Sequence, residues 1–124
     1  MELDVKDTKK KRYAYLDTRY DNKKYVFVEV YPLPNNIDTP AISKHTFIIP
    51  YDEPCGSLQV CARKYMPTLS SKMALFFFVD ASTKTAKNIH IALDATMLMS
   101  TLQTQYVKED GFVHIFYSAE NTFG

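Results

Sequence analysis

The chain has 124 residues, a formal net charge of +1 at pH 7 and 46% hydrophobic residues, values typical of a single globular domain. No apolar run approaches the roughly 20 residues of a membrane-spanning helix, and the charged N-terminus lacks the apolar stretch of a secretory signal. Two cysteines, Cys55 and Cys61, and scattered histidines favour reduced thiols in a cytosolic protein. We therefore expect neither a metal ion nor another cofactor.

The charge is distributed unevenly along the chain. Residues 1–24 carry eight basic and five acidic side chains, a net charge of +3, which leaves −2 for the remainder. The run Lys9-Lys10-Lys11-Arg12 fits an acidic partner or an anionic membrane surface, and it equally fits a solvated helix face. No extended basic patch alternates with aromatic residues, so we expect no binding to nucleic acid.

Four elements are expected in the first half of the chain. Residues 8–20 contain no Gly or Pro and place Tyr13, Leu16 and Tyr20 at helical spacing, which predicts an amphipathic surface helix. Residues 24–31 form the clearest strand, and a loop rich in Pro, Asn and Asp follows over residues 32–40. Residues 44–49 form a second strand, which Pro50 ends.

The second half continues with a helix predicted over residues 53–65, capped by Asp52. Residues 74–79 are a continuous apolar run of the kind found in a buried strand. Residues 80–91 show no clear pattern and are expected to form a surface loop. A helix over residues 96–106 and a closing strand over residues 112–118 complete the predicted elements.

The order of these elements is that of the ubiquitin-like β-grasp. The predicted fold class is therefore α+β, with a four-stranded mixed sheet, a crossing helix and an additional N-terminal helix. The expected organisation is a helical extension (1–24), a ubiquitin-like domain (25–118) and a flexible C-terminal tail (119–124).

The predicted strands are apolar on both faces. Val26, Val28 and Val30 share one face of the first strand, whereas Tyr25, Phe27 and Tyr31 share the other. Phe47 and Ile49 likewise oppose Ile48, and the third strand leaves Phe76 and Phe78 opposite its other apolar residues. Either Leu16 and Tyr20 of the N-terminal helix cover the second face, or a groove remains in which an extended peptide adds a strand.

The chain ends on Gly124, which follows a short polar segment. A terminal residue without a Cβ fits a narrow active-site channel, as needed for a protein that is joined to something else through its carboxyl end. The alternative is a frayed chain end that finishes on Gly without a functional reason. No catalytic motif is present, and Cys61 among Leu58, Val60 and Ala62 is typical of packing, so we do not expect an enzyme.

Three segments carry a resemblance: Ala74-Leu-Phe-Phe-Phe-Val79, Glu109-Asp-Gly-Phe112 and Tyr117-Ser-Ala-Glu-Asn-Thr-Phe-Gly124. They are similar to the autophagy-related protein 8 family of GABARAP-like ubiquitin-like modifiers. The similarity covers about residues 8–124 and is closest in the C-terminal third and around the third strand. The resemblance implies that a processing cysteine protease exposes Gly124. Ubiquitin-type activating and conjugating enzymes would then join Gly124 to phosphatidylethanolamine.

The resemblance also implies a groove for aromatic-x-x-aliphatic motifs of cargo receptors. Carried over by position, its aromatic pocket would consist of Leu16, Tyr25, Phe27, Ile48 and Phe112, and its aliphatic pocket of Phe47, Ile49, Pro50, Leu58 and Cys61. The family usually has a basic residue where Thr46 stands, and Lys44, Lys23 and Arg63 are candidates to replace it. Recognition by the processing and conjugating enzymes would involve Phe76, Phe78, Thr122, Phe123 and Gly124.

Several departures mark a divergent member of the family. Tyr25 stands where Pro is usual, Glu53 stands where an apolar residue is usual, and residues 82–91 resemble an insertion. The resemblance places the protein in the cytoplasm and, when lipidated, on the autophagosome membrane. Two alternatives stay open: an autophagy-related protein 12-like modifier joined to a protein lysine, and a peptide-binding adaptor that is not conjugated.

Overall fold

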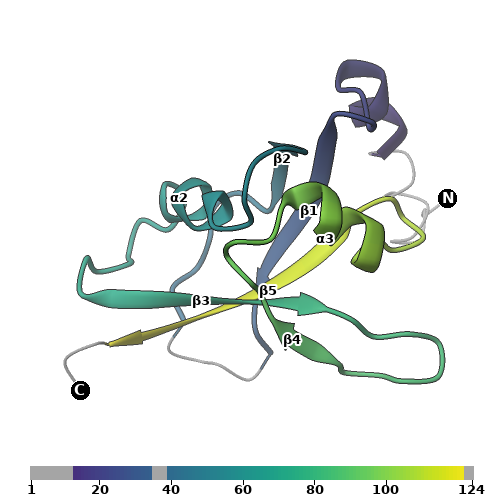
Figure 1. The fold of residues 1–124 in the computed structure, drawn as a ribbon. Helices are drawn as coiled ribbons and strands as arrows, with labels where there is room; N and C mark the ends of the chain where they lie inside the picture. The colour runs from purple at the N-terminus through teal and green to yellow at the C-terminus, as the bar shows by residue number, and fades with distance from the viewer. Residues whose placement is uncertain (1–12, 35–38, 122–124) are drawn as a thin grey trace, which may run out of the picture.

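A computed structural model describes residues 13–34 and 39–121. Its centre is one sheet of five strands in the order β2-β1-β5-β3-β4 (Figure 1). The strands are β1 (Tyr25–Pro32), β2 (Thr46–Pro50), β3 (Met73–Asp80), β4 (His90–Ala92) and β5 (Val113–Asn121), and the helices are α2 (Ser57–Arg63) and α3 (Met99–Tyr106). Residues 13–19 are also helical. The predicted α+β grasp with an N-terminal helix is therefore confirmed.

The middle of the sheet is β5. It pairs in parallel with β1 and antiparallel with β3, and the remaining strand pairs are antiparallel. Its Ile115 and Tyr117 are buried, and the Tyr117 hydroxyl donates a hydrogen bond of 2.5 Å to the carbonyl oxygen of Pro40. β5 is therefore paired on both sides and buried along most of its length.

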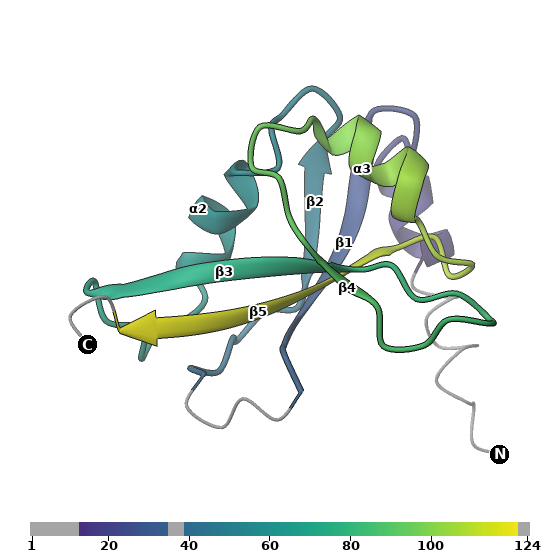
Figure 2. The same ribbon diagram turned by 60° about the horizontal axis from the view of Figure 1, so that its bottom comes forward.

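The main core lies between one face of the sheet and helices α2 and α3, which cover the same side (Figure 2). Val26, Val28 and Val30 of β1 contribute the sheet side, as the alternation of the strand predicts. Leu58 of α2 and Leu102 of α3 are completely or almost completely buried against them. Burial of this apolar face is the main favourable term for the fold.

A second, smaller core lies on the opposite face of the sheet, where helix 13–19 packs. We call it the aromatic cluster; its centre is the ring trio Tyr13, Phe27 and Phe112. The ring centre of Tyr13 lies 5.4 Å from that of Phe27 and 6.1 Å from that of Phe112, both in edge-to-face geometry. Leu16 completes the contact between helix and sheet. Helix 13–19 thus covers part of the second face through Leu16, whereas Tyr20 is 37% exposed, so the expected complete coverage is not reached and the groove alternative stays open at the β2 edge.

The four-strand prediction was wrong, because part of the expected 80–91 loop forms a fifth strand. Residues 90–92 pair with the end of β3, and the amide of Ala81 donates to the oxygen of Ile89 at 2.8 Å. The β-branched Ile89 and Ile91 favour extended backbone. Their pattern is too short to stand out from the polar residues around it.

Helix α2 is shorter than predicted and Asp52 does not cap it. The helix begins at Ser57 after Gly56, because the preceding amides bond to another part of the chain. The amide of Cys55 donates to the carbonyl oxygen of Met97 at 2.7 Å, and the amide of Gly56 donates to the carbonyl oxygen of Ala95 at 2.9 Å. The same contacts hold residues 95–97 outside α3, which begins only at Met99.

The closing strand is longer than predicted. Residues 119–121 belong to β5 and pair with the beginning of β3, down to Met73 opposite Asn121. Ala119 is buried there, so the prediction of a flexible tail from residue 119 was wrong for residues 119–121. The predicted helix residues 8–12 and tail residues 122–124 lie outside the described residues, and the domain division stays a prediction.

Gly111 provides a test of the aromatic cluster. It has a φ of +85°, and a Cβ at this position would lie 2.2 Å from a ring carbon of Tyr13. We expect Gly111→Ala to lower the free energy of unfolding by roughly 3 kcal/mol, because strain and steric overlap add. Urea denaturation measures the change.

The matched background is Tyr13→Ala, which removes the ring but leaves the backbone strain. In that background Gly111→Ala should cost only about 1–2 kcal/mol. An equal cost in both backgrounds would show that Tyr13 does not pack on Gly111.

Candidate functional site: the β2 edge and its pocket

The outer side of β2 is open to an additional strand. β2 is the last strand of the sheet on its side, and no other strand of the described residues pairs with its outer side. The amide of Val30 donates to the carbonyl oxygen of His45 at 2.8 Å. In an antiparallel pair every second residue bonds to the neighbouring strand, so the backbone groups of Phe47 and Ile49 also face β1. The N–H and C=O groups of Thr46 and Ile48 therefore point away from the sheet. This is the backbone geometry that an extended peptide requires.

An apolar pocket lies beside this edge, between β2 and α2. Its volume is about 340 Å³, and its lining consists of Ile48, Ile49, Pro50, Glu53, Ser57, Val60 and Cys61. Val60 is 63% exposed and forms an apolar rim on α2. One carboxylate oxygen of Glu53 accepts a hydrogen bond of 2.8 Å from Ser57 at the same rim. The pocket suits one aliphatic side chain of a peptide lying along β2.

The structure separates the residues expected in the aliphatic pocket into two groups. Ile49, Pro50 and Cys61 line the cavity. Phe47 and Leu58 are instead buried in the main core beneath it. Sequence reasoning missed Val60, Ser57 and the pocket position of Glu53. Val60 is exposed because α2 packs on the core with the face that carries Leu58 and Ala62, and the sequence alone did not indicate which face of α2 is buried.

The residues expected in the aromatic pocket come together, and three of them are buried. Leu16, Phe27 and Phe112 are 9%, 2% and 0% exposed, and Tyr25 and Ile48 pack around them half-buried. The Tyr13 ring occupies the centre of this group, although the sequence assigned it only to a helix face. Its own side chains therefore fill the position of the expected pocket.

The basic candidates lie in different places. Lys44 holds its ammonium 5.4 Å from the ring centre of Phe47 and 5.0 Å from that of Tyr65, next to the start of β2. Arg63 donates to the oxygen of Met73 at 2.7 Å and so points to β3. The Thr46 hydroxyl donates to buried Glu29 at 3.2 Å. Of these residues, Lys44 is the cation best placed for an acidic flank of a peptide.

Phe76 and Phe78 lie on β3, away from the β2 pocket. Phe76 is 45% exposed, Phe78 is half-buried, and both border a small hollow of about 190 Å³ near Cys55. Burial, with a smaller contribution from Asp94, raises the pKa of the Cys55 thiol to about 11, so this thiol stays protonated near neutral pH. The predicted enzyme-recognition residues Thr122, Phe123 and Gly124 lie outside the described residues.

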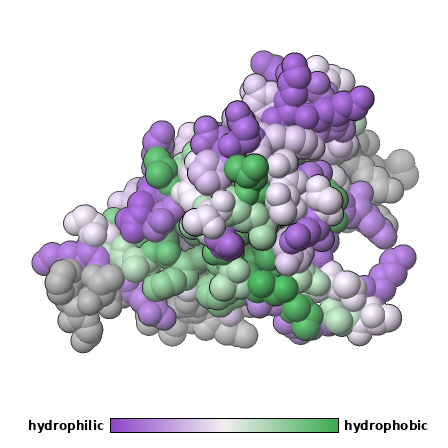
Figure 3. All heavy atoms as spheres, viewed as in Figure 1, coloured by the Kyte–Doolittle hydropathy of each residue, from purple (hydrophilic) through white to green (hydrophobic). Residues whose placement is uncertain are grey.

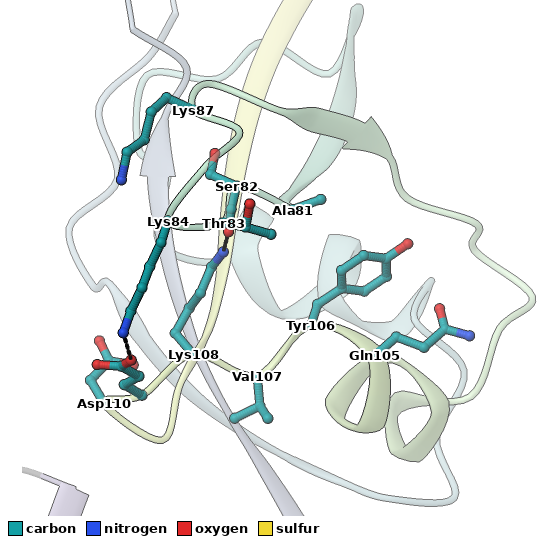
Figure 4. A pocket seen from close by; sticks show the side chains of 11 residues that line it. Ala81, Ser82, Thr83, Lys84, Lys87, Gln105, Tyr106, Val107, Lys108 and Asp110 are labelled. Carbon is teal, nitrogen blue, oxygen red and sulfur yellow. Dashed lines mark hydrogen bonds and ion pairs between the residues drawn. The ribbon is translucent and has the colours of Figure 1, made fainter.

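A further hollow of about 740 Å³ separates residues 81–87 from residues 105–110 (Figure 4). Lys108 donates to the oxygen of Ser82 at 2.5 Å and lies 3.6 Å from Asp80. Burial opposes ionisation of Asp80, but hydrogen bonds from Ser82 and the nearby positive charges outweigh it and lower its pKa. These contacts hold the inserted segment against the rest of the domain.

Within the described residues, no group of three or more His, Cys, Asp or Glu side chains is arranged to hold a metal ion. The helices of that part of the chain are also too short or too polar to cross a membrane.

Comparison with known families decides the relationship of this chain. The sequence model of the family described as "Autophagy protein Atg8 ubiquitin like" matches residues 8–124. The chain belongs to the Atg8 family. The resemblance drawn from its third strand and its terminal segment is thereby confirmed.

Individual relatives agree with this assignment. The chain is 39% identical over 87 residues to autophagy-related protein 8 of Pichia angusta, an alignment that covers 70% of this chain and 62% of that protein. The chain thus spans less than two thirds of that relative.

Two solved structures share the Atg8 fold. Trypanosoma brucei ATG8 has a TM-score of 0.71 at 22% identity, covering 98% of this chain and 93% of that one. Plasmodium falciparum Atg8, in complex with a P. falciparum Atg3 peptide, has a TM-score of 0.68 at 18% identity, covering 95% and 96%.

Proposed function

We propose that this chain is a ubiquitin-like modifier of autophagy whose Gly124 is joined to phosphatidylethanolamine. The observation that carries the proposal is the family match, which extends through the Asn-Thr-Phe-Gly segment to residue 124. Activated with ATP and held as a thioester on the conjugating enzyme, the Gly124 carbonyl would be attacked by the lipid amine, which forms the amide and releases the enzyme thiol. Attachment would move the protein from the cytoplasm to the autophagosome membrane.

In this proposal the chain is the carried modifier and not an enzyme. A processing cysteine protease and ubiquitin-type activating and conjugating enzymes act on it. The central position of β5 supports such a role, because the strand is paired on both sides and anchors the segment that precedes the conjugated residue. The exposed Phe76 beside β5 on β3 offers an apolar contact for those enzymes.

The second half of the proposal assigns the β2 edge to peptides of cargo receptors. The outward backbone groups of Thr46 and Ile48 supply strand pairing, and the pocket under Val60 takes an aliphatic anchor. Lys44 would meet acidic residues next to the motif. One neighbour of the same fold was solved with a peptide of Atg3, which supports peptide binding as a property to test.

Conjugation through Gly124 can be tested directly. We expect deletion of Gly124, or Gly124→Ala, to abolish the lipid-linked form and membrane attachment in cells, because the carboxyl of a bare glycine is the reacting group. Mass spectrometry of the cellular conjugate measures the outcome. Glu120→Gln, an exposed change in β5, serves as the control and should leave conjugation intact.

The same spectrum separates the alternatives. A conjugate in which Gly124 is joined to a lysine of another protein would favour a modifier of the autophagy-related protein 12 type. Normal partner binding and function without Gly124 would favour an unconjugated adaptor. A lipid-linked form that persists in the Gly124 deletion would contradict the proposal.

Peptide binding in the pocket can be tested as well. Val60→Asp should weaken an aromatic-x-x-aliphatic peptide roughly tenfold, because the anchor would desolvate a carboxylate. Val60 is so exposed that the fold should tolerate the change. Calorimetry gives the dissociation constants.

Tyr15→Asp is the matched control, since Tyr15 is 58% exposed on helix 13–19 and does not line the pocket. It adds the same charge and should leave affinity unchanged. Equal affinities of the wild type and Val60→Asp would exclude this pocket as the peptide site.

A further inference from the structure

The other end of the sheet carries a second open edge. β4 (His90–Ala92) has only three residues, and among the described residues β3 is its one partner strand. All three residues are exposed, and Ile89 and Ile91 are 41% and 43% exposed. Figure 3 shows apolar side chains gathered at the lower edge of the molecule, over β4.

The hydrogen bonds of β4 show which backbone groups face outward. The oxygen of Ile89 accepts from Ala81 at 2.8 Å, and the amide of Leu93 donates to Phe77 at 2.9 Å. Ile91, opposite Val79, belongs to the same alternating set and bonds to β3. The N–H and C=O groups of His90 and Ala92 therefore point away from the sheet.

This edge lacks the usual protection of natural sheet edges. Such edges carry proline, lysine or a bulge, which discourage pairing with another chain. The segment Ile89-His-Ile-Ala-Leu93 contains no Pro and no Lys. Its pairing with β3 is regular over residues 90–92, without a bulge. Its shortness is the remaining protection.

We propose that β4 pairs antiparallel with β4 of a second copy of this chain. With Ile91 on the two-fold axis, His90 of each copy lies opposite Ala92 of the other. Every outward N–H and C=O of the strand is then bonded, in two equivalent pairs. The two Ile91 side chains meet directly across the axis, as a cross-strand apolar pair. The two five-stranded sheets become continuous.

The edge matches itself, and this favours a second copy over a foreign peptide. Lys87 precedes β4 and exposed Asp94 follows it, so antiparallel pairing brings the lysine end of each copy to the aspartate end of the other. Backbone groups, apolar side chains and charges are all supplied by one segment. No other sequence is needed to complete the contact.

A contact of this length is weak, because stable interfaces bury about 1,000 Å² or more. We therefore expect a reversible dimer at high protein concentration. Attachment of many copies to one membrane would raise their local concentration. The dimer itself does not depend on that attachment and should therefore form from the free chain.

The test follows the ¹⁵N-labelled chain by NMR and by sedimentation from roughly 10 μM to 1 mM, a range that brackets a weak association. We expect concentration-dependent shifts centred on residues 88–94 and a sedimenting species that approaches a dimer. Amide exchange should slow at His90 and Ala92 and stay unchanged at Ile91, whose amide already bonds to β3.

Two variants and one control complete the experiment. Ala92→Pro removes an N–H that points away from β3, so it should lower the association constant at least roughly tenfold while keeping the fold. Ile91→Lys should do the same by placing like charges on the axis. Tyr15→Lys adds the same charge on the distant helix and should leave association unchanged.

Three outcomes would overturn the proposal. The chain could remain monomeric throughout the concentration range, or it could dimerise equally well in Ala92→Pro and Ile91→Lys. In the third outcome, an extended peptide of another protein pairs with β4 while the chain itself stays monomeric.

Discussion

The packing of Tyr13 against Phe27 and Phe112 is the contact on which the binding surface depends. It fixes helix 13–19 to the face of the sheet that α2 and α3 leave open. A sheet apolar on both faces needs such a cover, because burial of its second face contributes favourably only when water is excluded. The same contact places the Tyr13 ring at the position where an aromatic peptide anchor was expected. The groove is thereby reduced to the β2 edge and one aliphatic pocket.

The sheet ends in β2 on one side and β4 on the other, and these two edge strands differ in chemistry. The β2 edge lies next to a pocket of about 340 Å³, so a partner that pairs there also buries a side chain. The β4 edge presents Ile91 and Ile89 to solvent, and what it offers is strand pairing and a flat apolar contact. The first arrangement suits selective peptide binding, and the second suits weak self-association.

The sequence predicted most of the fold, because strands such as 74–79 and the alternation of Val26, Val28 and Val30 carry local signals. It did not predict where α2 begins. That boundary depends on bonds from Cys55 and Gly56 to residues 95–97, far along the chain. The pocket residues were carried over by position from the resemblance, which does not tell how α2 is turned in this chain, so exposed Val60 was missed and buried Leu58 was included. Tyr13 was predicted on a helix face, yet its edge-to-face contacts with both Phe27 and Phe112 follow from tertiary packing alone.

The most direct measurement is calorimetry of one aromatic-x-x-aliphatic peptide and its two single alanine variants against the folded chain. Because Tyr13 fills the aromatic position and the pocket beside Val60 is open, replacing the aliphatic anchor should weaken binding more than replacing the aromatic anchor. The Tyr13→Ala chain should then regain sensitivity to the aromatic anchor. A larger loss from the aromatic replacement in the unaltered chain would contradict the account.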